Sequence, residues 1–80
     1  MYRFRLELMS SHAAGEAGHE KIPIEMIAAT YDDPDAIRAS EHDVLREIRT
    51  RWFGALAVEV VVDNDDGRVV TVWLKGERRP

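Results

Sequence analysis

The segment from residue 56 to residue 75 leaves this chain little choice of local structure. It holds two runs rich in β-branched residues, 56–62 and 68–75, joined by the acidic sequence 63–67, which ends in Gly67. Such runs are typical of strands, and a glycine in the linker allows the positive φ that a tight turn needs. We therefore predict a β-hairpin. Its core face is expected to carry Leu56, Val58, Val60 and Val62 opposite Val70, Val72 and Leu74.

The first thirty residues predict two more strands separated by a loop. Residues 2–9 alternate between apolar and charged side chains, which is the period of a half-buried strand. Residues 10–20 contain glycines and serines without an apolar period, so we expect a loop. Residues 21–30 are interpreted as a strand because of their short length and β-branching, with a helix over 24–31 as the alternative.

A helix is expected to follow the second strand. Asp33 suits a capping position and Pro34 the first position of a helix. The carboxylates of Asp32 and Asp35 also favour the positive end of a helix dipole. A short turn followed by a main helix over 41–52 is the alternative. The apolar stripe of the helix comprises Ile37, Val44, Leu45, Ile48 and Trp52, and Gly54 is expected to end it.

Together these elements predict one α+β domain over residues 1–80. The expected fold is an antiparallel four-stranded sheet with one helix packed on one face, in the order β-β-α-β-β. On folding, a chain of 80 residues buries only about 60% of the surface that its unfolded form exposes, so its core is thin. The absence of cysteine excludes disulfides and favours a cytoplasmic location. We expect no signal peptide and no membrane span, because charged residues interrupt every apolar run.

No residue pattern predicts catalysis, a metal or a cofactor. His12, His19 and His42 have no cysteine to complete a zinc site, and solvated histidines are the preferred interpretation. The acidic turn fails the calcium-loop pattern, because that register places Val62 at the first ligand position and Trp73 at the twelfth. The chain also lacks the motifs of serine hydrolases, phosphate loops and dinucleotide-binding folds. We therefore expect a protein that is not an enzyme.

The sheet face turned away from the helix is the first candidate binding surface. Val61, Val69 and Trp73 are expected to form an apolar patch there, the pattern of an interface with a tryptophan anchor. Contact with another protein, a homodimer and cover by residues 10–20 are the three alternatives. The patch is expected to be rimmed by Arg3, Arg5 and Glu59, and the same face to carry Glu7, Ile27, Ala57 and Thr71.

Acidic residues form the second candidate binding surface. Capping and turn chemistry explain them, yet such carboxylates also complement a basic nucleic-acid groove on a partner protein. The net charge of −4 argues against direct binding of nucleic acid. One group at the expected helix start comprises Asp32, Asp33, Asp35, Glu41 and Asp43, and the other at the hairpin tip comprises Asp63, Asp65 and Asp66.

In size, acidity and its predicted strand-helix-hairpin plan, the chain resembles the small phage-encoded anti-CRISPR proteins, especially inhibitors of type I surveillance complexes. The resemblance covers the whole chain, rests on architecture and assigns no role to any residue. It implies a non-catalytic inhibitor that binds Cas subunits in the host cytosol and blocks binding of target DNA. The alternatives from other classes are a toxin-antitoxin component and a small oligomeric phage structural or assembly protein.

Overall fold

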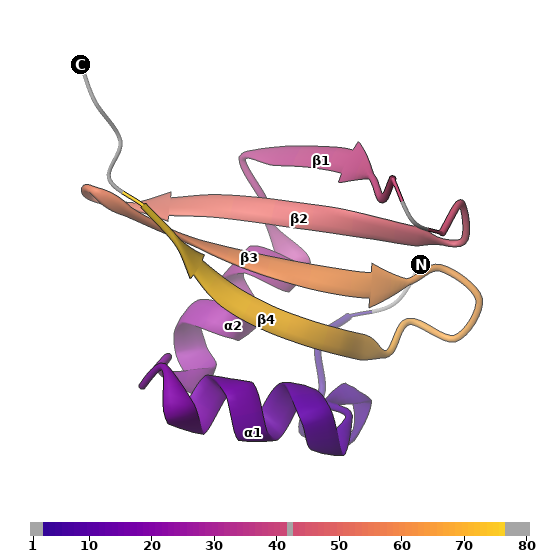
Figure 1. Cartoon of the computed structure of the whole chain (residues 1–80), viewed down its shortest axis with the longest axis horizontal. Helices are drawn as coiled ribbons and strands as arrows, with labels where there is room; N and C mark the ends of the chain where they lie inside the picture. The colour runs from indigo at the N-terminus through magenta and orange to yellow at the C-terminus, as the bar shows by residue number, and fades with distance from the viewer. Residues whose placement is uncertain (1–2, 42, 77–80) are drawn as a thin grey trace.

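The computed structural model describes residues 3–41 and 43–76. It contains a four-stranded antiparallel sheet in the order β1-β2-β3-β4, with helices on one side of it (Figure 1). The α+β class and the antiparallel four-stranded sheet are as predicted, but the order β-β-α-β-β with a single helix is wrong, because two α-helices precede all four strands. The elements are η1 (Leu6–Leu8), α1 (Ser11–His19), α2 (Ile24–Asp32), β1 (Ala36–Ala39), β2 (Arg46–Phe53), β3 (Leu56–Asp63) and β4 (Val69–Lys75).

The predicted hairpin is confirmed as β3 and β4, with one change of register. Val61 pairs with Thr71, whereas Val62 pairs with Val69, so a β-bulge leaves Val70 as the extra residue. A slip of one residue moves a side chain to the opposite face of a sheet. Val69, expected on the outer face, is therefore fully buried in the core in place of Val70. Leu56, expected in the core, is 46% exposed at the end of β3.

The interpretation of residues 2–20 is wrong in both of its parts over the described residues 3–20, and Tyr2 lies outside the described residues. Residues 6–8 form the short helix η1, and Met9 makes a single bridge to Val69 where we expected a strand. Residues 11–19 form α1 in place of the expected loop. The Ser10 hydroxyl caps this helix by accepting a 3.0 Å hydrogen bond from the Ala13 N–H. Ala13 and Ala17, one helical turn apart, bury its inner face against the core.

The second predicted strand is a helix, which is the alternative weighed for residues 24–31. Ile27 and Tyr31 are four residues apart on α2 and point into the core, where both are almost fully buried. Asp33 is the residue after the last helical turn, and Pro34 follows it. The Asp-Pro sequence therefore stands where a helix ends, because the residue before a proline disfavours helical backbone.

The helix predicted after Asp33 is wrong, since this region forms β1 and β2. Val44 and Leu45 lie in the turn between the two strands and are 88% and 58% exposed. Residues 47–52 of β2 alternate between charged and less polar side chains, and pairing with β1 and β3 on both sides prevails over helix propensity. Gly54 has φ of 69° in the tight turn from β2 to β3, so it ends a strand rather than a helix.

Tyr31 connects the helices to the sheet at the centre of the core. Its hydroxyl donates a 2.6 Å hydrogen bond to the Gly67 carbonyl in the β3–β4 turn. The Arg49 guanidinium stacks 4.6 Å from the centre of its ring, and Phe4 packs edge-on at 5.7 Å. These contacts hold α2 and the segment around Phe4 on one side of the sheet, where α1 also packs on the core, and no described helix covers the opposite face (Figure 1). None of the helices in the described ranges is long and apolar enough to cross a bilayer.

The end of α1 provides a test of local backbone strain. Lys21 has φ of 58°, and its N–H and that of Ile22 donate to the carbonyls of Gly18 and Ala17, which is the Schellman arrangement. Glycine adopts this conformation without a Cβ clash, so Lys21→Gly is expected to raise the free energy of unfolding by about 0.5–1 kcal/mol in urea titrations. Lys21→Ala keeps the clash and serves as the control. If Lys21→Gly is no more stable than Lys21→Ala, the backbone at position 21 is not strained.

Candidate binding face of the sheet

The face of the sheet turned away from the helices carries one side of every strand. We call it the open face, because no described helix packs on it (Figure 1). Cross-strand partners point to the same face, so the pairing register decides its membership. The open face comprises Ala36 and Arg38 from β1, Ile48, Thr50 and Trp52 from β2, Ala57, Glu59 and Val61 from β3, and Thr71, Trp73 and Lys75 from β4.

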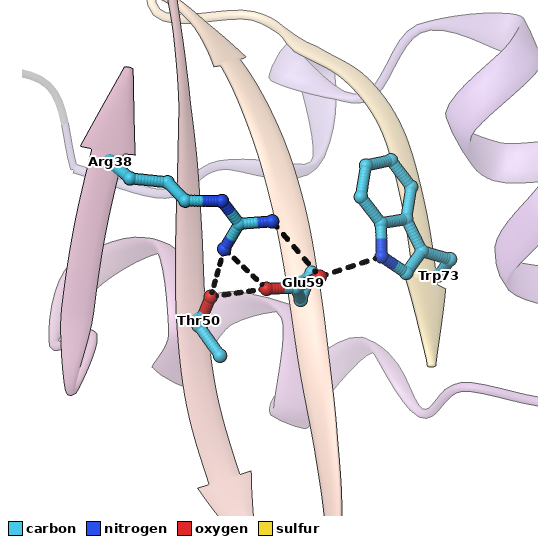
Figure 2. A network of polar contacts seen from close by, with 4 residues as sticks. All are labelled: Arg38, Thr50, Glu59 and Trp73. Carbon is cyan, nitrogen blue, oxygen red and sulfur yellow. Dashed lines mark hydrogen bonds and ion pairs between the residues drawn. The ribbon is translucent and has the colours of Figure 1, made fainter. Parts of the chain in front are cut away.

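A buried carboxylate stands at the centre of the open face. Glu59 lies on the inner strand β3, directly between Thr50 and Trp73 of the neighbouring strands, and its side chain is only 3% exposed. The Thr50 hydroxyl donates to Glu59 Oε2 at 2.6 Å, and the Trp73 indole Nε1–H donates to Oε1 at 2.8 Å (Figure 2). The two flanking strands thus supply one hydrogen bond to each oxygen of the carboxylate.

Arg38 supplies the charge that balances Glu59. It reaches from the edge strand β1 across β2, and its Nη1 donates to Glu59 Oε2 at 2.8 Å while Nη2 lies 3.5 Å from Oε1 (Figure 2). Nη1 also donates to the Thr50 hydroxyl at 3.4 Å. A buried charge is tolerated when it is paired and its remaining lone pairs are hydrogen-bonded, and Glu59 meets both conditions. The four residues therefore form one network that spans all four strands.

The network keeps both charged groups ionised. Burial of Glu59 by itself raises its pKa, but the hydrogen bonds from Arg38, Thr50 and Trp73, with the charge of Arg38, lower that pKa to about 2. The hydrogen bond to Glu59 raises the pKa of Arg38 against the opposing effect of burial, and the charges of Glu59 and Glu41 add to the increase. Trp73 thus donates to a carboxylate that carries full negative charge at neutral pH.

Beside this network the open face is hollowed. The hollow has a volume of about 330 Å³ and extends from Trp73 to the chain that leaves β1. Ile48 provides its apolar part, and the polar atoms come from the β1 side and from the indole. Its lining residues are Arg38, Ala39, Ser40, Glu41, Ile48 and Trp73.

Several residues expected on this face lie elsewhere. Val61 and Trp73 occupy the open face as predicted, with Ala57 and Thr71, whereas Glu59, expected at the rim of the patch, is buried at the centre of the face. Arg3 and Arg5 are exposed in the N-terminal segment, whose Phe4 packs on Tyr31 at the helix side, so they do not rim the patch. The corrected placements have two causes: the described residues 3–9 form no strand, and the bulge in the hairpin turns Val69 inward. Glu7 lies in η1, and Ile27 of α2 is in the core.

The connection between α2 and β1 is held together by three residues of the first acidic group, Asp32, Asp33 and Asp35. Asp32 accepts a 2.7 Å hydrogen bond from the Phe4 N–H, and Asp35 accepts one of 2.8 Å from the Trp52 N–H. Asp33 pairs with Arg51 at 3.0 Å. None of the three starts a helix, which corrects the expectation of a capping cluster. Each has a local structural partner.

At the opposite end of β1 lie the remaining acidic residues, which are Glu41 and Asp43 of the first group and the three aspartates of the hairpin tip. Glu41 and Asp43 follow β1 and lie with the hairpin tip, because the Asn64 N–H donates to the Leu45 carbonyl at 2.7 Å. This end of the sheet therefore joins two clusters that the sequence placed apart. Asp43, Asp63 and Asp66 each accept a hydrogen bond from the N–H two residues later, as turn-forming aspartates do. Asp65 lies between them in the hairpin turn.

The described residues contain no group of three or more histidine, cysteine, aspartate or glutamate side chains placed to hold a metal ion. His12 and His19 are exposed on α1, and His42 lies outside the described residues. Comparison of the chain with protein-family models, curated proteins and solved structures gave no match.

The ionised state of Glu59 predicts how stability depends on pH. Its pKa is about 2 in the folded protein and ordinarily 4.5, so its contribution is complete above about pH 5 and is lost as the pH falls towards 2. The difference between the two values corresponds to about 3 kcal/mol. In urea titrations we expect Glu59→Gln to be less stable than the native chain at pH 7, and this gap to narrow steadily on acidification.

The quantity compared is the difference in free energy of unfolding between the native chain and Glu59→Gln at each pH, because contributions common to both proteins cancel in it. The matched control is Glu25→Gln, because Glu25 is exposed in the first turn of α2, away from the network. A gap that stays constant from about pH 5 to pH 2 contradicts a lowered pKa for Glu59.

Proposed function

We propose that this protein is a non-catalytic binding protein that engages a protein partner through the open face of its sheet. The observation that carries the proposal is the fixed position of Trp73. Its indole is hydrogen-bonded at 2.8 Å to a buried carboxylate and lines a hollow on a face that no described helix covers. Tryptophans held in one orientation are the residues on which interfaces concentrate binding energy, because little conformational freedom is lost on association.

Two observations favour a different protein over the other occupants of the face. Residues 11–19 form α1 on the helix side of the sheet, so the prediction that this segment covers the open face is wrong. Two copies of a chain with net charge −4 repel each other, whereas the same charge complements a basic surface. The acidic end around Glu41 and Asp43 lies next to the hollow and is positioned to add to this attraction.

An inhibitor of the anti-CRISPR class is the specific candidate within this proposal. Small size and acidity support it, while the strand-helix-hairpin plan gives it no support, because both helices precede the sheet. The partner would then be Cas subunits of a type I effector complex in the host cytoplasm. We expect one equivalent of the protein to abolish binding of labelled target DNA by such a complex in a gel-shift assay. Unchanged DNA binding at saturating protein rejects this candidate.

The open face itself is tested by site-specific photo-cross-linking in cells that produce the protein. A photoreactive phenylalanine replaces Lys75, which is exposed on the open face opposite Ala57, or Ala14, which is exposed on α1. We expect a discrete adduct with another protein from position 75 and none from position 14. Adducts of equal yield from both positions, an adduct of two copies of the chain, or none at all would each contradict the proposal. Circular dichroism confirms that both variants fold.

A further inference from the structure

The charges around the hollow do not balance. Arg38 is paired with Glu59 at 2.8 Å. Arg46, the first residue of β2, lies 3.5 Å from Asp43. Both arginines on this side of the sheet are thus already matched by carboxylates. Glu41 is exposed at the rim of the hollow, and the described part of the chain provides it with no ion pair. The charge of Glu41 also acts on Arg38, but Glu41 and Glu59 together outnumber that one guanidinium, so the hollow and its network carry one negative charge in excess.

The other walls suit the stem and the head of a long cationic side chain. Trp73 lines the hollow, an indole is the best partner for a cation among aromatic rings, and the Nε1–H bond to Glu59 fixes the orientation of this ring. Ile48 offers an apolar surface for an aliphatic stem. The volume of about 330 Å³ lies at the lower end of the range for ligand sites, which matches a single side chain better than a folded segment.

We propose that the hollow receives one arginine or lysine side chain presented by a protein partner, with the cation between Trp73 and Glu41 and the stem on Ile48. This inference rests on the proposed function of the open face and names the chemistry of the partner at its centre. The Glu59 carboxylate is shielded within its own network, so Glu41 provides the carboxylate that a basic side chain reaches from solvent.

The alternative occupants of the hollow fit its chemistry less well. A carboxylate or phosphate would approach Glu41 and compete with Glu59 for Arg38, whose pair is made within the network. An apolar side chain would contact Ile48 and Trp73 but would gain nothing from Glu41, and it would remove that carboxylate from water without a partner. A basic side chain gains from both Glu41 and the apolar wall, and the charge of Arg38, which also lines the hollow, is offset by Glu59.

The test is a titration of the isotope-labelled protein with the peptide acetyl-Gly-Arg-Gly-amide, followed by the indole N–H signals in NMR spectra. The control ligand replaces arginine with citrulline, which has the same shape and no charge. Trp52 is an internal control, because it lies on the same face but outside the hollow. We expect a saturable shift of the Trp73 indole signal and of residues 38–41, with binding about 3- to 30-fold weaker for citrulline.

Two variants make the result decisive. Glu41→Gln is expected to weaken binding of the arginine peptide towards that of the citrulline peptide, because only the contact of the cation with Trp73 remains. Glu25→Gln makes the same change of net charge on α2 and leaves binding unchanged. Equal binding of both peptides, no saturable shift, or insensitivity to Glu41→Gln each overturns the inference. If these results accompany a specific adduct from position 75, the open face binds its partner through other contacts. If the arginine peptide binds but no adduct forms, the proposed function fails while the cation site stands.

Discussion

The ionised carboxylate of Glu59 is the constraint on which the open face depends. β3 is buried on both faces: the helices cover one face, and side chains from the other strands cover the other. A charge at its centre must therefore find its hydrogen-bond donors within the sheet. Arg38, Thr50 and Trp73 provide the donors, one from each of the other strands. The network thereby fixes the edge strand β1 to the sheet and orients the indole that we assign to binding. The same four side chains thus stabilise the sheet and shape the surface that we propose for binding.

The fold was predictable where the local pattern has one solution. The hairpin of β3 and β4 follows from its β-branched runs and its glycine turn. Residues 2–9 and 46–53 show the same alternation, yet residues 46–53 form a strand because β3 offers them a partner. The described residues 3–9 meet β4 only at Met9 and form no strand. The Asp-Pro sequence fits either end of a helix, so it cannot by itself say whether a helix starts or stops. The bulge that turns Val69 inward leaves no clear mark in the sequence.

The site was predictable only in its central strand. Glu59 stands in the β-branched run 56–62, and the alternation of that run placed it on one face with Trp73, but as an exposed residue at the rim of the patch and not as a buried charge. Arg38 and Thr50 were missed because the segment that holds them was interpreted as a helix, which hides cross-strand neighbours. Most of the acidic residues were identified by type but not by role. Asp32, Asp35 and their neighbours mainly satisfy backbone N–H groups, so net charge alone overstated their part in binding.

The pKa of Glu59, measured through the chemical shift of its carboxyl carbon in an NMR titration, tests this account most directly. The account predicts a midpoint near pH 2, with the Trp73 indole N–H signal following the same curve because it donates to that carboxylate. A midpoint near the ordinary value of 4.5, or an indole signal that does not respond, would contradict an ionised network at the centre of the open face.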